Sequence, residues 1–225
     1  MAVLGVDGWR GAWVGARLDG RSVELLDLRR VADVLAVADV EVVGIDMPIG
    51  LSDDGVRACD VAARLALRGR GAAGSVFPAP VRPVLDARDY AHARELSRAA
   101  TGGARAPSAQ TYQLVAAIRD LDRALGDPPD PRVTEVHPEL AFRALDGGVR
   151  DAKGTARGMA QRLAALRGVM DVDAALLAAP LRVPAVDALD ACAAAWSARR
   201  IADGTAECVG DGTTDARGRP MRICW

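Results

Sequence analysis

The chain of 225 residues has few of the residues that build common metal and nucleic-acid sites. Its two histidines and four cysteines include no C-x-x-C pair, which argues against a zinc site. Aromatic residues make up 4% of the chain, too few for an extended surface that stacks bases. The 29 basic and 30 acidic residues give a net charge of −1, so any binding to nucleic acid would need a local patch.

Long apolar runs are also missing. No uncharged apolar run approaches the ~20 residues of a membrane span, and no basic region followed by a long apolar segment opens the chain. The scattered cysteines (Cys59, Cys192, Cys208 and Cys224) are typical of reduced thiols in the cytosol. We therefore expect a cytoplasmic protein without a membrane partner. Lys153 is the only lysine, and its position after an acidic loop indicates a surface role.

The hydrophobic content of 50% is enough for one well-packed domain over residues 1–225. Short β-like runs separated by glycine turns, and later helical periodicity, predict an α/β protein with a mixed sheet and flanking helices. Residues 68–110 are rich in Gly, Pro and Arg and predict a long irregular insertion with a short helix near 88–98. The inserted subregion as a whole covers about 68–130.

The predicted elements follow one another in an order that suggests the sheet. An antiparallel meander comes first, and the next strand is expected to run parallel to the first because a helix lies between them. The predicted strands are 2–7, 11–18, 22–27, 40–46 and 132–137, the last ended by Pro138, with a terminal hairpin of 206–209 and 221–225. The predicted helices are 28–37, one capped by Asp53 or Asp54 and running to about 67, 109–125, 155–169 and 185–203.

Two of the short apolar strands end in an aspartate that is followed by turn residues. Asp7 precedes Gly8, and Asp46 precedes a segment with Pro48 and Gly50. One such aspartate is typical of a turn, but the repeat favours a site, because open α/β sheets bind ligands at the carboxyl ends of strands. Carboxylates on neighbouring strands repel unless a cation or a shared proton compensates. Oxygen ligands of this kind suit Mg²⁺ or Mn²⁺.

A third acidic pair lies near the start of the last predicted helix. Asp187 and Asp190 are three residues apart and share one helical face. The helix dipole is sufficient to explain Asp187. Asp190 stands in a run of small apolar residues, where a buried charge needs a partner, and a metal shared with Asp7 would provide one.

A compact polar motif follows the strand at 132–137. Glu135, His137 and Glu139 lie on one side only if the chain stays extended past Pro138. A neutral imidazole can bind a metal or carry a proton. The alternative is an exposed strand end with ordinary polar residues, which we favour less because valines flank the motif.

Arg57, Asp60 and Arg64 have helical spacing. The ordinary interpretation is a salt-bridged, solvated helix face. The functional interpretation is a clamp for phosphate or carboxylate, since arginine binds such groups through two parallel hydrogen bonds. Ser75 and Arg82 are candidates to close over the same pocket.

Several of these segments together resemble a known family. The sequence is similar to the DUF429 family, described as predicted nucleases with a ribonuclease H-like fold. The predicted element order is also that of a ribonuclease H-like fold, although other α/β folds fit with different strand pairing. The matching segments are Gly5–Trp9, Ile45–Gly50, Arg57–Arg64, Ser75–Pro78, Glu135–Glu139 and Asp187–Ala191.

The resemblance implies a metal-dependent phosphoester hydrolase such as a nuclease, in which the metal activates water and stabilises the leaving oxygen. The implied ligands of one or two Mg²⁺ or Mn²⁺ ions are Asp7, Asp46, Asp187 and Asp190, and the implied catalytic set adds Glu135 and His137. The implied substrate-binding residues are Arg57, Arg64, Ser75, Arg82 and Lys153. Val186 stands where the family often has a second acid. This difference bears on which residues would bind the metal more than on the expected fold.

Two other functions remain open. A non-catalytic module on the same fold would bind a ligand or nucleic acid without turnover. An ATP-dependent phosphotransferase is a weaker alternative, because sugar kinases with a similar first hairpin need a second domain that 225 residues do not supply. The near-neutral charge favours a small phosphoester substrate or a short nucleic-acid end over long duplex DNA.

Overall fold

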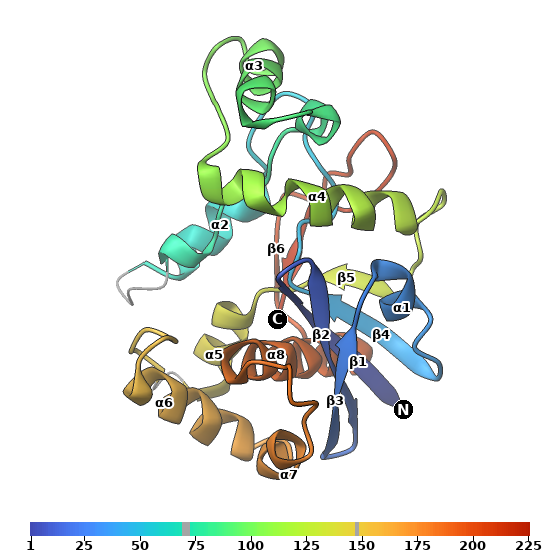
Figure 1. Cartoon of the computed structure of the whole chain (residues 1–225), viewed down its shortest axis with the longest axis vertical. Helices are drawn as coiled ribbons and strands as arrows, with labels where there is room; N and C mark the ends of the chain where they lie inside the picture. The colour runs from blue at the N-terminus through green and yellow to red at the C-terminus, as the bar shows by residue number, and fades with distance from the viewer. Residues whose placement is uncertain (69–72, 147–148) are drawn as a thin grey trace.

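The computed structural model describes residues 1–68, 73–146 and 149–225, and its centre is a five-stranded mixed sheet (Figure 1). The strand order is β3-β2-β1-β4-β5. The strands are β1 (Ala2–Trp9), β2 (Ala12–Asp19), β3 (Ser22–Leu28), β4 (Val40–Ile45) and β5 (Val133–Glu135). β1 to β3 form an antiparallel meander, and β4 and β5 run parallel to β1. The α/β class, the meander and the parallel fourth strand are therefore confirmed.

Helices cover both faces of this sheet, because successive side chains of a strand point to opposite sides. Val3 belongs to one core, with residues of α2 (Ala58–Ala66), α5 (Pro138–Asp146), α6 (Ala156–Arg167), α7 (Val172–Leu177) and α8 (Ala185–Ala202). Leu4 belongs to the other, with residues of α1 (Val31–Leu35), η2 (Arg82–Asp86), α3 (Tyr90–Ala100) and α4 (Ala109–Ala124). Figure 1 shows α5 to α8 gathered on one side and α3 and α4 on the other.

The contact between β1 and α8 is unusually close. A Cβ atom at Gly5 would lie 2.0 Å from the backbone nitrogen of Ala195 and 2.2 Å from the carbonyl oxygen of Ala191. Glycine on the strand and alanines on the helix let the two backbones approach. This packing fixes the first turns of α8 beside the carboxyl ends of β1 and β4.

Several predicted boundaries were wrong for identifiable reasons. The helix predicted over 28–37 is the single short α1, and α2 begins at Ala58 rather than after Asp53 or Asp54. β5 stops at Glu135, before the predicted end at His137, and Pro138 opens the unpredicted helix α5, since proline is well suited to the first position of a helix. α7 was not predicted. The subregion at 68–130 contains η1 (Ala73–Ser75), η2, α3 and α4, and residues 69–72 of it lie outside the described residues.

The C-terminal hairpin is confirmed, but the prediction that all four thiols are reduced was wrong. β6 (Cys208–Val209) pairs with β7 (Ile223–Cys224), and this register places Cys208 opposite Cys224. The two form a disulfide, with 4.1 Å between their Cα atoms. Cys59 and Cys192 are free and buried. Within the described ranges, none of the helices has the length and apolar character needed to cross a membrane.

Candidate functional site

Asp7, Asp46 and Asp190 line one cleft of about 1160 Å³. Asp7 lies in β1, and Asp46 directly follows β4, whose Ile45 pairs with Val6. The backbone amide of Asp46 donates to the Val6 carbonyl over 2.9 Å, which holds the two strand ends side by side. α8 contributes Asp190 from its first turns, so three elements that the sequence singled out separately meet in one place.

The carboxyl groups in this cleft are electrostatically unfavourable when ionised. Burial raises the pKa of Asp7 well above its ordinary value, and the charges of Asp46 and Asp190 raise it further. Burial also raises the pKa of Asp46, opposed by His137 and Lys153. Burial raises the pKa of Asp190 to about 6 even though Lys153 lowers it. Ionisation of these three carboxyl groups is therefore disfavoured mainly by burial, and the charge of Lys153 opposes that effect at each of them.

Lys153 is the cation closest to these acids. Its ammonium lies 2.6 Å from Asp190 Oδ2, and the charges of Asp190, Asp7 and Asp46 raise its pKa despite burial. The loop that carries it packs tightly on the start of α6, because a Cβ atom at Gly158 would lie 2.1 Å from the Ala152 carbonyl oxygen. Lys153 is exposed, as its sequence position predicts, and it also lines the cleft.

The acids suit a divalent cation in chemistry and charge. Asp190 Oδ1 is buried and has no hydrogen-bond partner among the residues that the structure describes. The neighbouring carboxylates offer oxygen ligands, which Mg²⁺ and Mn²⁺ prefer. The positions of these side chains do not yet form a metal site. In the described part of the chain, no three or more His, Cys, Asp or Glu side chains are already arranged to hold one ion. A cation would have to draw the carboxylates together and compete with Lys153.

Other candidates lie at the edge of this acidic cluster. Asp187 is partly buried; burial raises its pKa, while Lys153 and, more weakly, Arg10 lower it. His137 lines the cleft, and its buried Nδ1 has no hydrogen-bond partner within the described part of the chain. Glu139 does not share a strand face with His137, because α5 begins at Pro138. It lines the cleft from that helix and pairs with a buried arginine of α6.

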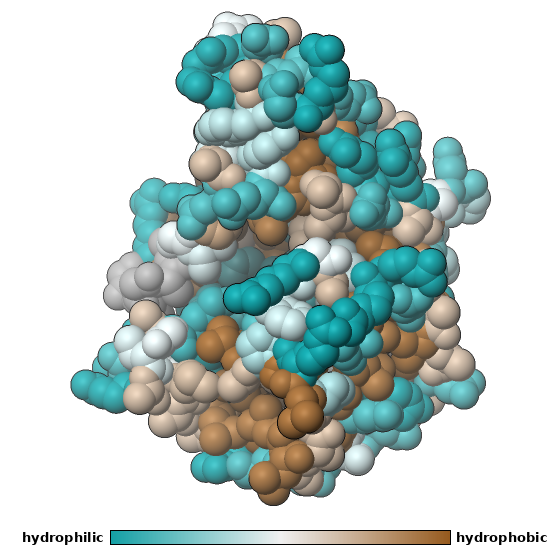
Figure 2. Space-filling model, in the orientation of Figure 1, coloured by the Kyte–Doolittle hydropathy of each residue, from teal (hydrophilic) through white to brown (hydrophobic). Residues whose placement is uncertain are grey.

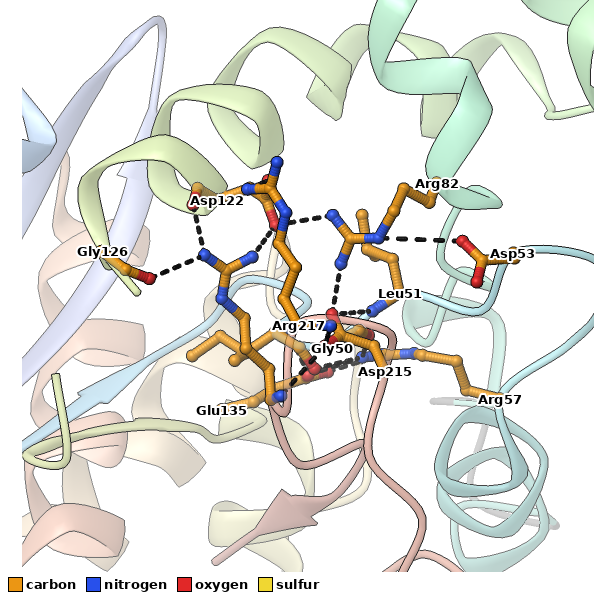
Figure 3. A network of polar contacts seen from close by, with 12 residues as sticks. Gly50, Leu51, Asp53, Arg57, Arg82, Asp122, Gly126, Glu135, Asp215 and Arg217 are labelled. Carbon is orange, nitrogen blue, oxygen red and sulfur yellow. Dashed lines mark hydrogen bonds and ion pairs between the residues drawn. The ribbon is translucent and has the colours of Figure 1, made fainter. Parts of the chain in front are cut away.

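Glu135 and Arg57 are partners of each other. The Arg57 guanidinium donates to both carboxylate oxygens of Glu135 over 2.7 Å (Figure 3). It also donates to Asp60 over 2.5 and 3.2 Å. The carbonyls of Ile49 and Gly50 accept its remaining hydrogen bonds. Neither predicted interpretation of Arg57 describes this arrangement, since the pair with Asp60 is buried rather than solvated and the guanidinium is fully engaged within the protein. Burial raises the pKa of Glu135 to about 7, although Arg57 lowers it.

The remaining predicted substrate-binding residues are dispersed. Ser75 lines the cleft. Arg64 is exposed and donates to the Val76 carbonyl over 2.8 Å. Arg82 is not among the lining residues of the cleft and belongs to a second network, where it pairs with Asp215 and, over 3.1 Å, with Asp122 (Figure 3). That network ties the C-terminal segment to α4.

Sequence reasoning missed part of the cleft wall. Trp9 and Arg10 line it from the β1–β2 hairpin, and Arg123 lines it from α4. One signal was available for Arg10, which precedes Gly11 in a tight turn where Asn, Asp or Gly is expected. Arg123 carried no signal, because nothing local shows which face of α4 borders a cleft.

Comparison with known proteins identifies the family of the chain. A family model described as "Protein of unknown function (DUF429)" matches residues 5–215. Since this range covers nearly all of the sequence, the chain belongs to the DUF429 family, as its motifs indicate. Searches among curated proteins and among solved structures give no significant match.

Proposed function

We propose that this DUF429 protein is a divalent-metal-dependent hydrolase of phosphoester bonds, nuclease-like in its chemistry and built on a ribonuclease H-like fold. The observation that carries the proposal is the convergence of Asp7, Asp46 and Asp190 in one cleft, where burial disfavours their ionised forms unless a cation lies close. The strand order β3-β2-β1-β4-β5, with acids at the carboxyl ends of β1 and β4, supports the fold assignment.

In this proposal Asp7, Asp46 and Asp190 hold Mg²⁺ or Mn²⁺, with Asp187 adjacent. The bound ion would supply Lewis-acid stabilisation of the phosphoryl oxygens and a nucleophilic water. The chain's own groups do the rest. Lys153, displaced from Asp190 by the ion, would neutralise negative charge on the phosphoryl group. His137 Nδ1, which has no hydrogen-bond partner among the described residues, can take or give a proton at the cleft wall. Glu135 and Arg57 contribute by holding the segment after Asp46 in place.

The direct test is hydrolysis of a simple phosphodiester, bis(p-nitrophenyl) phosphate, and of a short oligonucleotide with Mn²⁺ present or chelated. We expect metal-dependent cleavage that falls to background in Asp46→Asn. Asp19→Asn, an exposed carboxylate at the end of β2, is the matched control and should leave the rate unchanged. Cleavage that survives chelation, or that Asp46→Asn leaves intact, would contradict the proposal.

A specific observation supports a second candidate, a non-catalytic binding module. Lys153 already places a cation 2.6 Å from Asp190, and the described acids do not form a completed metal group. A module of this kind would bind an anionic ligand in the cleft without metal. Ligand binding in the presence of a chelator, together with no cleavage of either substrate when Mn²⁺ is supplied, would favour it.

A further inference from the structure

The cleft that holds the acidic cluster is also lined by exposed arginines. Arg10, Arg29, Arg30 and Arg123 line it, and we call these four residues the arginine rim. All four are exposed, and they come from the β1–β2 turn, the β3–α1 connection and the last turn of α4. In Figure 2 hydrophilic side chains gather over the two turns, in the middle of the face shown. The cleft thus has an acidic interior and a basic margin.

Two rim arginines lack the partners that most arginines of this protein have. Arg29 pairs with Asp27 and Arg30 with Asp33, each over 3.2 Å. The side chains of Arg10 and Arg123 form neither a hydrogen bond nor an ion pair with the described residues. The guanidinium of Arg10 instead lies 6.0 Å from the centre of the Trp9 ring. Both cations are therefore available to an anionic ligand.

Arg10 also occupies a backbone conformation that arginine adopts reluctantly. Its φ of +46° is in the left-handed region, and Gly11 follows at φ +78°. Such hairpin turns favour Asn, Asp or Gly at this position. At positive φ the Cβ atom of other residues crowds the following carbonyl oxygen, whereas glycine has no Cβ and Asn or Asp can form a local hydrogen bond. Arg10 is a strained residue at the mouth of a cleft, and its side chain forms no hydrogen bond or ion pair with the described residues, although its charge acts weakly on Asp187. This combination indicates that the side chain serves a ligand.

We propose that the arginine rim binds the backbone of a single-stranded nucleic acid, with Trp9 offering a surface on which a base can stack. This inference deepens the proposed function and rests on it, since it names the substrate class of the same cleft. The volume of about 1160 Å³ exceeds the ~300–1,000 Å³ typical of small-ligand pockets. Arginines from several segments can contact successive phosphates of a nucleic-acid backbone. An aromatic side chain beside them can stack on a base that is not paired.

Binding can be measured without metal by the fluorescence anisotropy of a labelled oligothymidylate of about 10 nucleotides in EDTA. If four arginines contact phosphates, the logarithm of the association constant should fall with the logarithm of salt concentration with a slope of about −3. Arg123→Ala should weaken binding about 3- to 10-fold and make the slope shallower by about 0.7. Arg98→Ala is the control, because Arg98 is an exposed arginine in the last turn of α3 and lies outside the cleft.

Arg10→Asn separates loss of binding from loss of folding. Asn suits the left-handed position, so the melting temperature should stay the same or rise by a few degrees. Binding should nevertheless fall about 3- to 10-fold. A variant that folds at least as well as the parent and binds less tightly supports a ligand role for Arg10.

Three results would overturn the inference. They are an affinity unchanged by both Arg10→Asn and Arg123→Ala, a duplex of the same length that binds as tightly as the single strand, and complete competition by equimolar thymidine monophosphate. Calorimetry of the wild-type chain with Mn²⁺ alone tests the proposed function separately. Rim-dependent strand binding without Mn²⁺ binding would refute the hydrolase and leave the rim inference standing.

Discussion

Replacement of Asp190 by Asn changes the pH dependence of stability in a way that follows from the site. Asp190 is 1% exposed, and its pKa is raised to about 6, whereas an aspartate in an unfolded chain has a value near 3.9. The folded state therefore holds this proton more tightly than the unfolded state does. A difference of about two pKa units corresponds to about 3 kcal/mol.

The sign follows from the same linkage. Well below pH 4 the Asp190 carboxyl is protonated in both the folded and the unfolded chain, so its burial does not lower the free energy of unfolding there. As pH rises through about 6 the folded state is forced to ionise a buried group, so the wild-type chain loses about 3 kcal/mol of stability from this residue. Asp190→Asn cannot ionise and avoids that loss. The attraction of Lys153 is already part of the pKa of about 6, because Lys153 lowers that pKa.

Urea unfolding between pH 4 and pH 8 measures the effect. The free energy of unfolding of Asp190→Asn minus that of the wild type should increase by about 3 kcal/mol from pH 4 to pH 8. Asp19→Asn, on the surface at the end of β2, should show no comparable trend. A difference for Asp190→Asn that is flat or falls with pH would refute the reasoning, because Asp190 would then behave as an ordinary ionised partner of Lys153.

Three further predictions concern the framework. Arg57→Met leaves Glu135 buried without its cation, and the free energy of unfolding at neutral pH should fall by about 3–5 kcal/mol in urea denaturation. Gly5→Ala sets a methyl group against the backbone of Ala195 and should cost about 3 kcal/mol or more, read as a lowered melting temperature; an unchanged value would show that β1 and α8 are not in close contact. Cys208→Ser opens the C-terminal loop and should cost about 3 kcal/mol in non-reducing conditions, with no difference once both proteins are reduced.

The sequence was informative where a local pattern has one structural meaning. Alternating apolar runs with glycine turns predicted the meander, and two strands ending in acids predicted that Asp7 and Asp46 lie side by side. Asp190 was identifiable because a charge in an alanine-rich helix conflicts with burial unless it has a partner. Each of these inferences depends on neighbours in sequence and on the geometry of one element.

Other features depend on residues far apart in the chain. Glu135 ends a strand as Asp7 and Asp46 do, yet it pairs with Arg57, which is 78 residues away and has no local signature. The disulfide shows a different limit. The terminal hairpin was predicted, and its register places Cys208 opposite Cys224. The prediction of reduced thiols instead followed the general behaviour of scattered cysteines and did not use this pairing. Lys153 reaches the acids only because Gly158 lets its loop pack against α6.

The most direct test of the central claim is a crystal structure determined with Mn²⁺, with the metal located by its anomalous scattering. The account predicts a peak bound by Asp7, Asp46 and Asp190 at about 2.0–2.3 Å from their oxygens, with Lys153 displaced from Asp190. The absence of a peak at saturating Mn²⁺, with the Lys153–Asp190 ion pair intact, would contradict it.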